Sequence, residues 1–330
     1  MAADLEGALY HQLMERRRRL ESLRPSGNRS THLLHLIEEV DAALERMDEG
    51  SFGICRVCNE PIEEDLLTAD PLVRACLDHL TPERRQALER DLDLASAIQN
   101  HLLPKRDIRW GGWEAAFAYE PLGSVSGDYC DLLPPRTPDG DFLFLLGDVS
   151  GKGIAASMLM AHLNATVRSL AAEDMPPSRL VAQVNRLFCE STMDSHYATL
   201  VCGLAGPEGT IELSNAGHCR PLIVSDGRVE ALKDAGMPVG FFCTMDYPSI
   251  RRELKVGESL VLFSDGLTDT ENPAGEHYGE ERLKAFLGRH SGLAPRDFLA
   301  ACSRDVEGFR NGAARTDDLS MMVLTRIPQQ

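Results

Sequence analysis

The pattern of apolar residues predicts two helices at the start of the chain. Leucines recur at helical spacing over residues 3–24 and again over residues 31–49. Between them the stretch Arg24-Pro25-Ser26-Gly27-Asn28-Arg29 breaks the periodicity, as turn residues do. Ser30 or Thr31 can cap the second helix. We therefore expect a helical hairpin.

A further helix is predicted from Pro82 to Leu103, because proline suits a first helical turn and Pro104 cannot continue the helix. Its apolar residues follow the four-three spacing of a coiled-coil seam, which Gln99 interrupts. The seam residues are Leu88, Leu92, Ala95 and Leu102. Two interpretations remain open: a helix packed on the domain that follows it, and a connector that joins two chains.

Beyond residue 107 the pattern changes to short apolar runs, typical of strands, in clusters between helical stretches. The predicted strands are 113–119, 141–146, 198–204, 210–213, 221–224, 260–263 and 319–325. The predicted helices lie near 154–171, 178–192, 280–288 and 295–310. Strands and helices do not alternate strictly, so we expect an α+β domain with layered sheets.

Short acidic segments flank these strands. Asp148 and Asp265 directly follow predicted buried strands, whereas Asp317 and Asp318 directly precede one. Carboxylates held at strand ends converge, and a buried carboxylate cluster without nearby Lys or Arg either binds protons or holds cations. Oxygen ligands select Mg²⁺ or Mn²⁺.

The N-terminal part carries a second kind of ligand pattern. Cys55 and Cys58 form one close pair, and Cys76 and His79 form another after residues 59–75. Two such pairs supply the four ligands of a structural zinc site. The alternative, three reduced cysteines and a surface histidine, does not explain two tight pairs flanked by turn residues. The six remaining cysteines are expected to be free thiols.

Composition narrows the class of partner. The chain has 330 residues, 43% of them hydrophobic, and a net charge of −17. Such acidity argues against a general nucleic-acid or anionic-membrane binder, and indicates a protein partner. No apolar run approaches a membrane span and the N-terminus lacks a secretory signal, so we expect a cytoplasmic protein.

The acidic segments also carry a resemblance. They are Ser126-Gly127-Asp128-Tyr129-Cys130-Asp131, Gly147-Asp148-Val149-Ser150-Gly151-Lys152-Gly153, Ser264-Asp265-Gly266-Leu267-Thr268-Asp269 and Thr316-Asp317-Asp318-Leu319-Ser320. In order and spelling they resemble the bacterial metal-dependent serine/threonine protein phosphatases (PPM type) of the RsbU/SpoIIE-like group. Residues 98–104, 197–200 and 215–218 also match stretches of that family. The resemblance implies two antiparallel sheets packed as a sandwich, flanked by helices, with two Mn²⁺ or Mg²⁺ ions in a cleft at one end.

The resemblance also implies roles for particular residues. Asp148 bridges the two ions, the carbonyl of Val149 completes one shell, and Asp265 and Asp317 bind the other ion. Asp128 acts directly or through a coordinated water. Asp131, Asp269 and Asp318 are expected to contact the metal ligands without binding the ions themselves, or to be exposed to solvent. Ser150 stands where some relatives have a histidine that protonates the leaving group, so the general acid is unassigned.

Residues 1–80 resemble the DksA/TraR zinc-finger family. His79 replaces its usual fourth cysteine, and Arg24 and Arg29 occupy the turn where longer members carry an acidic tip, which disfavours binding to RNA polymerase. We thus expect three parts: a helical hairpin with a zinc finger (1–80), an amphipathic linker helix (81–107) and a phosphatase domain (108–330).

The leading hypothesis is a phosphatase that acts on phosphoserine or phosphothreonine of a regulatory protein, an anti-sigma factor antagonist by resemblance. It would be regulated by its zinc module and would form a homodimer through the linker helix. One alternative is a non-catalytic zinc-finger regulator or polymerase-binding protein fused to a degenerate phosphatase fold. Another is a hydrolase of cyclic nucleotides or small phosphoesters. The retained aspartates favour an enzyme.

Overall fold

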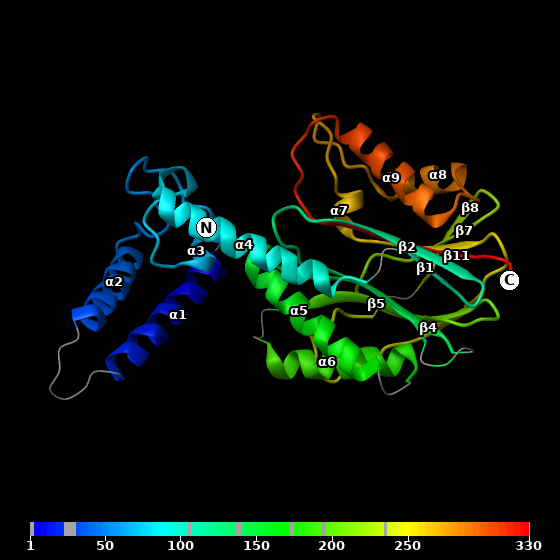
Figure 1. The fold of residues 1–330 in the computed structure, drawn as a ribbon, viewed down its shortest axis with the longest axis horizontal. Coiled ribbons are helices and arrows are strands. Elements are labelled where there is room, and N and C mark those ends of the chain that lie inside the picture. Colours follow the sequence, from blue (N-terminus) through cyan, green and yellow to red (C-terminus); the bar gives the residue numbers. More distant parts are fainter. Residues whose placement is uncertain are drawn as a thin grey trace. The chain divides into compact units, whose positions relative to one another are not determined.

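The chain forms two compact units, Met1–Asp93 and Leu94–Gln330. In this computed structural model the described residues are 3–22, 31–104, 107–135, 137, 140–171, 175–192, 196–233 and 236–329. The division falls within α4 (Pro82–Leu102), which carries the chain from one unit to the next (Figure 1). The finer division at residues 80 and 107 stays a prediction.

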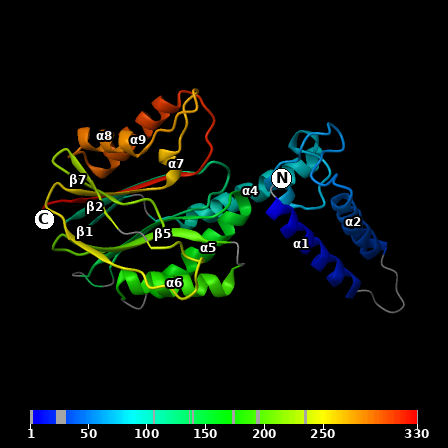
Figure 2. The same ribbon diagram turned by 180° about the vertical axis from the view of Figure 1, so that it is seen from behind.

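The N-terminal unit begins with two helices, α1 (Ala3–Ser22) and α2 (Thr31–Asp48), which pack side by side (Figures 1 and 2). Their buried apolar residues include Leu13 and Val40. Two short helices follow, α3 (Glu64–Ala69) and the 3₁₀ helix η1 (Leu77–His79). Both helices of the predicted hairpin are confirmed, whereas the turn and the predicted cap at Ser30 lie outside the described residues.

The C-terminal unit contains two antiparallel sheets. The six-stranded sheet has the order β1 (Asp107–Trp110), β2 (Trp113–Glu120), β11 (Leu319–Arg326), β10 (Ser259–Phe263), β7 (Leu222–Ser225) and β8 (Arg228–Ala231). The five-stranded sheet has the order β3 (Asp128–Leu133), β4 (Phe142–Val149), β5 (Ala198–Ala205), β6 (Thr210–Ala216) and β9 (Ile250–Glu253). The predicted sandwich is therefore confirmed.

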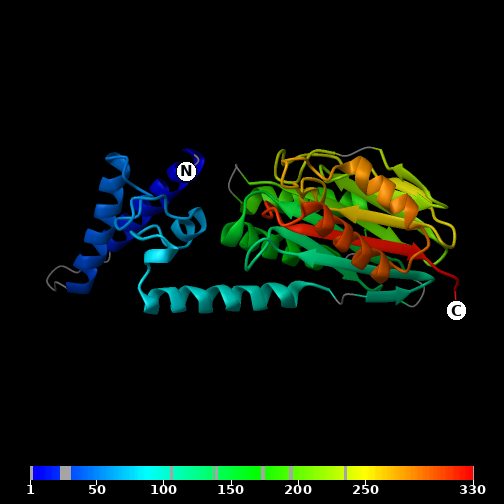
Figure 3. The ribbon, with the colours of Figure 1, turned by 90° about the horizontal axis from the view of Figure 1, so that it is seen from above.

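Helices cover the outer face of each sheet. α5 (Gly153–Leu170) and α6 (Pro177–Ser191) pack on the five-stranded sheet. α8 (Glu280–Arg289) and α9 (Pro295–Arg310) pack on the six-stranded sheet, as Figures 1 and 3 show. None of the helices described is long and apolar enough to cross a bilayer.

Alternation of side chains explains why the central strands read as continuous apolar runs. In β4, Phe144 and Leu146 belong to the core between the sheets, whereas Leu143 and Leu145 pack in the core that includes α5 and α6. Successive residues of a strand point to opposite faces, and here both faces are buried. The central strands are thus fixed by packing on two sides, which gives the residues at their ends defined positions.

The strands that were predicted are present, with small shifts of their ends. β4 continues to Val149, so Asp148 lies inside this strand and does not follow it. Strands β1, β3, β8 and β9 were not predicted. Two of the six residues of β3 are charged, Asp128 and Asp131, and β9 (Ile-Arg-Arg-Glu) is mostly exposed. Neither sequence therefore shows the apolar pattern of a strand.

Candidate active site and a separate Cys/His cluster

Two strand pairs bring the acidic residues to one end of the sandwich. In the five-stranded sheet Asp128 of β3 lies directly opposite Asp148 of β4. In the other sheet β10 and β11 are antiparallel neighbours, so Asp265, just after β10, and Asp317, just before β11, share one edge. The Ser264 hydroxyl links the sheets, because it donates to Asp128 Oδ2 at 3.1 Å.

A glycine permits the close approach on the β11 side. Gly266 lies in the short helix α7 (Asp265–Thr268), directly after Asp265. A Cβ atom at this position would lie 1.9 Å from the carbonyl oxygen of Asp318, a distance that no side chain allows. Glycine is therefore required for α7 to sit against the start of β11, and this contact keeps Asp265 beside Asp317.

The carboxylates of this cluster raise one another's pKa values. Burial, followed by the charges of Asp265, Asp317 and Asp318, raises the pKa of Asp148 to about 7. Burial and the charge of Asp148 raise the pKa of Asp128 well above its ordinary value. Lys152 opposes this effect at Asp148, and its Nζ lies 3.1 Å from Asp317 Oδ2. One lysine does not balance these carboxylates, so the donor set and its charge suit divalent cations.

The carboxylate of Asp318 accepts hydrogen bonds from two backbone N–H groups. Its Oδ1 accepts the N–H of Leu122 at 2.6 Å and its Oδ2 accepts the N–H of Gly127 at 3.0 Å. Both carboxylate oxygens therefore fasten the loop between β2 and β3 to the start of β11. The contacts indicate a positioning role for this side chain.

Asp131 faces the other side of β3. It is three residues from Asp128, and an odd separation places two residues on opposite faces of a strand. Its fully buried side chain accepts two hydrogen bonds from Arg168 of α5, at 2.8 and 2.9 Å, and one from the Tyr129 hydroxyl at 3.1 Å. Asp131 therefore joins β3 to α5, on the face of the strand opposite to Asp128.

Ser150, His218 and Asp269 also lie near the acidic cluster, and their contacts differ. The backbone N–H of Ser150 donates to the carbonyl of Tyr197 at 2.8 Å, and its hydroxyl accepts the Tyr197 N–H at 3.0 Å. His218 is buried, which lowers its pKa to about 4, and its Nδ1 lies 2.8 Å from Thr199 Oγ1. Thr199 pairs with Asp148 in the β4–β5 ladder, so His218 supports the strand behind the site. Asp269 is exposed at the end of α7.

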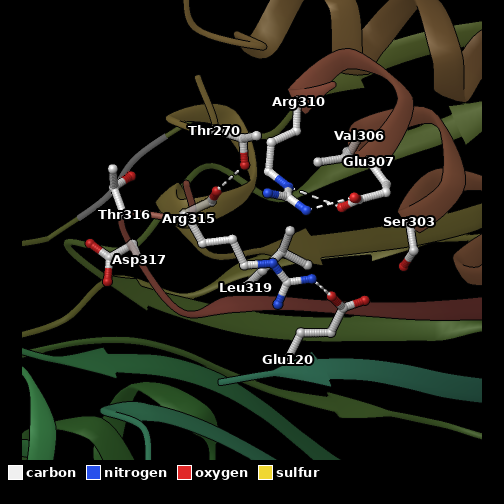
Figure 4. Close-up of a pocket in the computed structure, with 11 residues that line it drawn as sticks. Glu120, Thr270, Ser303, Val306, Glu307, Arg310, Arg315, Thr316, Asp317 and Leu319 are labelled. Atoms are coloured by element: carbon white, nitrogen blue, oxygen red, sulfur yellow. Dashed lines mark hydrogen bonds and ion pairs between the residues drawn. The ribbon is translucent and has the colours of Figure 1, made fainter. Parts of the chain in front are cut away.

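A pocket beside Asp317 contains two arginines that the sequence pattern did not single out (Figure 4). Arg315 forms an ion pair with Glu120 at the end of β2, and Arg310 pairs with Glu307 at 2.6 Å. Their charges are thus compensated within the pocket. The Arg315 pair fastens the segment that carries Asp317 to the neighbouring strand. No sequence signal indicates it, because the partners are far apart along the chain.

The N-terminal unit holds a separate cluster made of Cys55, Cys58, Cys76 and His79. Each of these four side chains offers one ligand atom, and the four atoms all lie within 4.8 Å of one another. The Sγ atoms of Cys58 and Cys76 are 3.8 Å apart, and His79 Nδ1 lies 3.2 Å from Cys76 Sγ and 4.0 Å from Cys55 Sγ. Ligands at zinc distances in a tetrahedron are about 3.3–3.8 Å apart, so the separations of these atoms are close to those that one zinc ion would require.

Comparisons with known proteins agree with this fold. The family model described as Stage II sporulation protein E (SpoIIE) matches residues 138–327. "Protein IcfG" of Synechocystis sp. is 26% identical over an alignment of 266 residues, and the match covers 72% of this chain and 41% of that protein. "Phosphoserine phosphatase RsbU" of Bacillus subtilis is 25% identical over 193 residues, 57% of each protein. The chain thus spans about half the length of these relatives.

Among solved structures, the SiaA-PP2C domain of Pseudomonas aeruginosa superposes with a TM-score of 0.66. The sequences are 18% identical, and the match covers 75% of this chain and 100% of that domain. At this identity the likeness concerns the fold of the two sheets and their helices.

Proposed function

The chain belongs to the SpoIIE family, and from this we propose that its C-terminal unit is a metal-dependent protein serine/threonine phosphatase. The observation that carries the proposal is the meeting of Asp128, Asp148, Asp265 and Asp317 at one end of the sandwich. The raised pKa values of three of them, Asp128, Asp148 and Asp265, mean that the cluster favours a bound cation or proton. The relative named a phosphoserine phosphatase supports the same activity.

We assign two Mn²⁺ or Mg²⁺ ions to this cluster. Asp148 would contact both ions, with the carbonyl of Val149 on one side and Asp265 and Asp317 on the other. Asp128, opposite Asp148 across the β3–β4 ladder, would act directly or through water. Two bound ions supply a water of lowered pKa and neutralise charge on the phosphoryl group.

The protein's own side chains fix the geometry that this chemistry needs. Ser264 orients the Asp128 carboxylate through its 3.1 Å hydrogen bond, and Lys152 holds Asp317. Asp318 acts on the loop that precedes Asp128, and Asp269 adds negative charge near Asp265. The Ser150 hydroxyl accepts the N–H of Tyr197, and a serine hydroxyl is too weak an acid to protonate the leaving oxygen near neutral pH. The general acid remains unassigned.

The proposed substrate is a phosphorylated serine or threonine of a regulatory protein, of the class of anti-sigma factor antagonists. Support comes from the net charge of −17, which disfavours nucleic acid and anionic membranes as partners. Hydrolysis of small phosphoesters is the competing activity, because it would use the same ions.

For the N-terminal unit we propose one zinc ion held by Cys55, Cys58, Cys76 and His79, and a regulatory role for the unit. Thiolate ligands require reduced cysteines, which supports a cytoplasmic location. Zinc would hold the turn at Cys55–Cys58 against η1, where His79 lies.

We also propose that two chains associate through α4. Of the predicted seam, Leu88 packs on the core of the N-terminal unit and Leu102 on that of the C-terminal unit. Leu94 and Ile98, by contrast, are 61% and 56% exposed on the middle of the helix. Leu94 and Ile98 lie one helical turn apart on the same face, so their burial against a second chain would stabilise a homodimer.

The activity is tested with the full chain, Mn²⁺ and phosphorylated candidate antagonists, with p-nitrophenyl phosphate in parallel. We expect turnover of the phosphoprotein to depend on added Mn²⁺ or Mg²⁺ and to be lost in Asp148→Asn, because a ligand of both ions is removed. Asp297→Asn, an exposed change in the first turn of α9, serves as the control. Undiminished turnover by folded Asp148→Asn would contradict the mechanism, and turnover of the small ester alone would favour the competing activity.

A further inference from the structure

Gln99 makes an unusual pair of contacts from the last turns of α4. Its side chain is 6% exposed, whereas its neighbour Ile98 is 56% exposed. Its Nε2 donates to the carbonyl oxygen of Ser126 at 2.7 Å, and its Oε1 accepts the N–H of Ser126 at 2.9 Å. The side-chain amide therefore forms two hydrogen bonds with the backbone of one residue, in the way that a peptide group of a neighbouring strand would.

Ser126 begins the segment that leads to the acidic site. Its hydroxyl accepts the N–H of Asp128 at 3.0 Å. The next residue, Gly127, donates its N–H to Asp318 and accepts the N–H of Val149 at 3.3 Å through its carbonyl. Residues 126–128 are thus held from three directions: by α4, by the end of β4 and by the start of β11.

The backbone groups of Ser126 have no strand partner of their own. β3 begins only at Asp128, so the ladder with β4 does not extend to Ser126. Ser126 is fully buried, and a buried N–H or C=O without a partner is costly. Gln99 supplies both missing partners.

The segment also has little room to move. A Cβ on Gly127 would lie 3.0 Å from the carbonyl oxygen of Val149 and 3.4 Å from Asp148 Oδ1. The backbone of Gly127 therefore passes close to two of the groups assigned to the ions. A displacement of Ser126 would be transmitted to Asp128 through the Ser126 hydroxyl and to Asp318 through the Gly127 N–H.

We propose that Gln99 is a positioning residue for the metal site, which holds the Ser126–Asp128 segment so that Asp128, Asp148 and Val149 keep a metal-binding arrangement. The inference rests on the proposed function, since that function assigns the ions. It also makes the last turns of α4 part of the site's support, so a force on this helix acts directly on Ser126.

The test compares Gln99→Met with Gln86→Met in the zinc-loaded full chain. Methionine has nearly the shape of glutamine but cannot form the two hydrogen bonds, and Gln86 is an exposed residue of the same helix. Two quantities are measured: hydrogen–deuterium exchange of peptides covering residues 121–131, and Mn²⁺ affinity by titration calorimetry. We expect faster exchange confined to that segment and Mn²⁺ binding weaker by about tenfold or more in Gln99→Met, with Gln86→Met like the wild type.

Gln99→Asn covers the case in which Gln99→Met does not fold. Its amide has the same donor and acceptor on a stem one methylene shorter, so we expect a smaller loss of Mn²⁺ affinity with the same local pattern of exchange. Unchanged Mn²⁺ affinity in the folded variant, or exchange that rises evenly over the whole C-terminal unit, would overturn the proposal. Neither measurement uses a phosphoprotein, so the role of Gln99 is tested independently of whether the protein hydrolyses phosphoserine or phosphothreonine.

Discussion

Replacing Asp148 by asparagine should stabilise the metal-free C-terminal unit even though it removes the proposed activity. The pKa of Asp148 rises from 3.8 to about 7 because of burial and the neighbouring carboxylates. A raised pKa in the folded state means that the folded protein binds this proton more tightly than the unfolded chain does. The cost of the charged form is therefore complete above about pH 7 and fades as the pH falls toward 4.

The expected magnitude follows from the shift. About three pKa units correspond to about 4 kcal/mol at pH 8, and linkage leaves about 1 kcal/mol at pH 4.5. Asparagine has nearly the same shape and no charge, so Asp148→Asn should gain up to about 4 kcal/mol of unfolding free energy at pH 8 and less at pH 4.5. Added Mn²⁺ should stabilise the wild type, by about 2.7 kcal/mol at a hundredfold excess over Kd, and the variant much less.

Urea unfolding in the presence of a chelator measures this effect. The chain has 2 tryptophans, and Trp110 and Trp113 both lie in the C-terminal unit, so their fluorescence reports this unit even when the chelator removes zinc elsewhere. Asp297→Asn is the matched control: its carboxylate is exposed in the first turn of α9, so the same change of residue should alter the unfolding free energy by less than about 1 kcal/mol at both pH values. If Asp148→Asn proves no more stable than the wild type at pH 8, or gains equally at both pH values, the carboxylates do not repel one another as argued.

Two further predictions concern the N-terminal unit and α4. Elemental analysis should find about one zinc per chain. Cys55→Ser should lose this zinc and unfold the N-terminal unit, while tryptophan fluorescence shows that the C-terminal unit stays folded. If protein purified without a chelator contains no zinc, the zinc site is refuted. For α4, light scattering and activity on one phosphoprotein are compared in the full chain, residues 82–330 and residues 108–330. We expect a dimer that is lost in Leu94→Asp and activity that differs between the three by about five- to 150-fold. Monomers of equal specific activity would show the helix to be a passive tether.

The sequence pattern predicted the strands with a clear apolar run. It missed the short, largely exposed strands β1, β8 and β9, and it missed β3, a buried strand that carries charge. β3 was missed because Asp128 and Asp131 break its apolar run, although all its residues except Leu133 are buried. Their compensation comes from Ser264 and Arg168, which are distant along the chain. Pairing of this kind is a property of the folded state, so no local pattern indicates it.

The same limit applies to the candidate site. The apolar runs beside the acidic segments placed Asp148, Asp265 and Asp317 near strand ends, and the structure brings these residues to one end of the sandwich. In the segment Ser126–Asp131 only the resemblance separated Asp128, placed at the metal site, from Asp131; the residues themselves gave no reason to treat the two differently. Their odd spacing decides the matter once the segment is known to be a strand, because one side chain then faces the other sheet and the other faces α5.

The raised pKa values also explain why the site needs so many ties to the surrounding backbone. Carboxylates that repel one another would move apart in the metal-free protein unless the segments that carry them were fixed by other contacts. Each acidic segment has such a contact: Ser264 holds Asp128, Gly266 permits α7 to rest on β11, and Lys152 holds Asp317. Gln99 adds a tie that comes from outside both sheets. Because the central strands are packed on both faces, a helix that holds this segment is the place where a signal would alter the spacing of the carboxylates without unfolding the core.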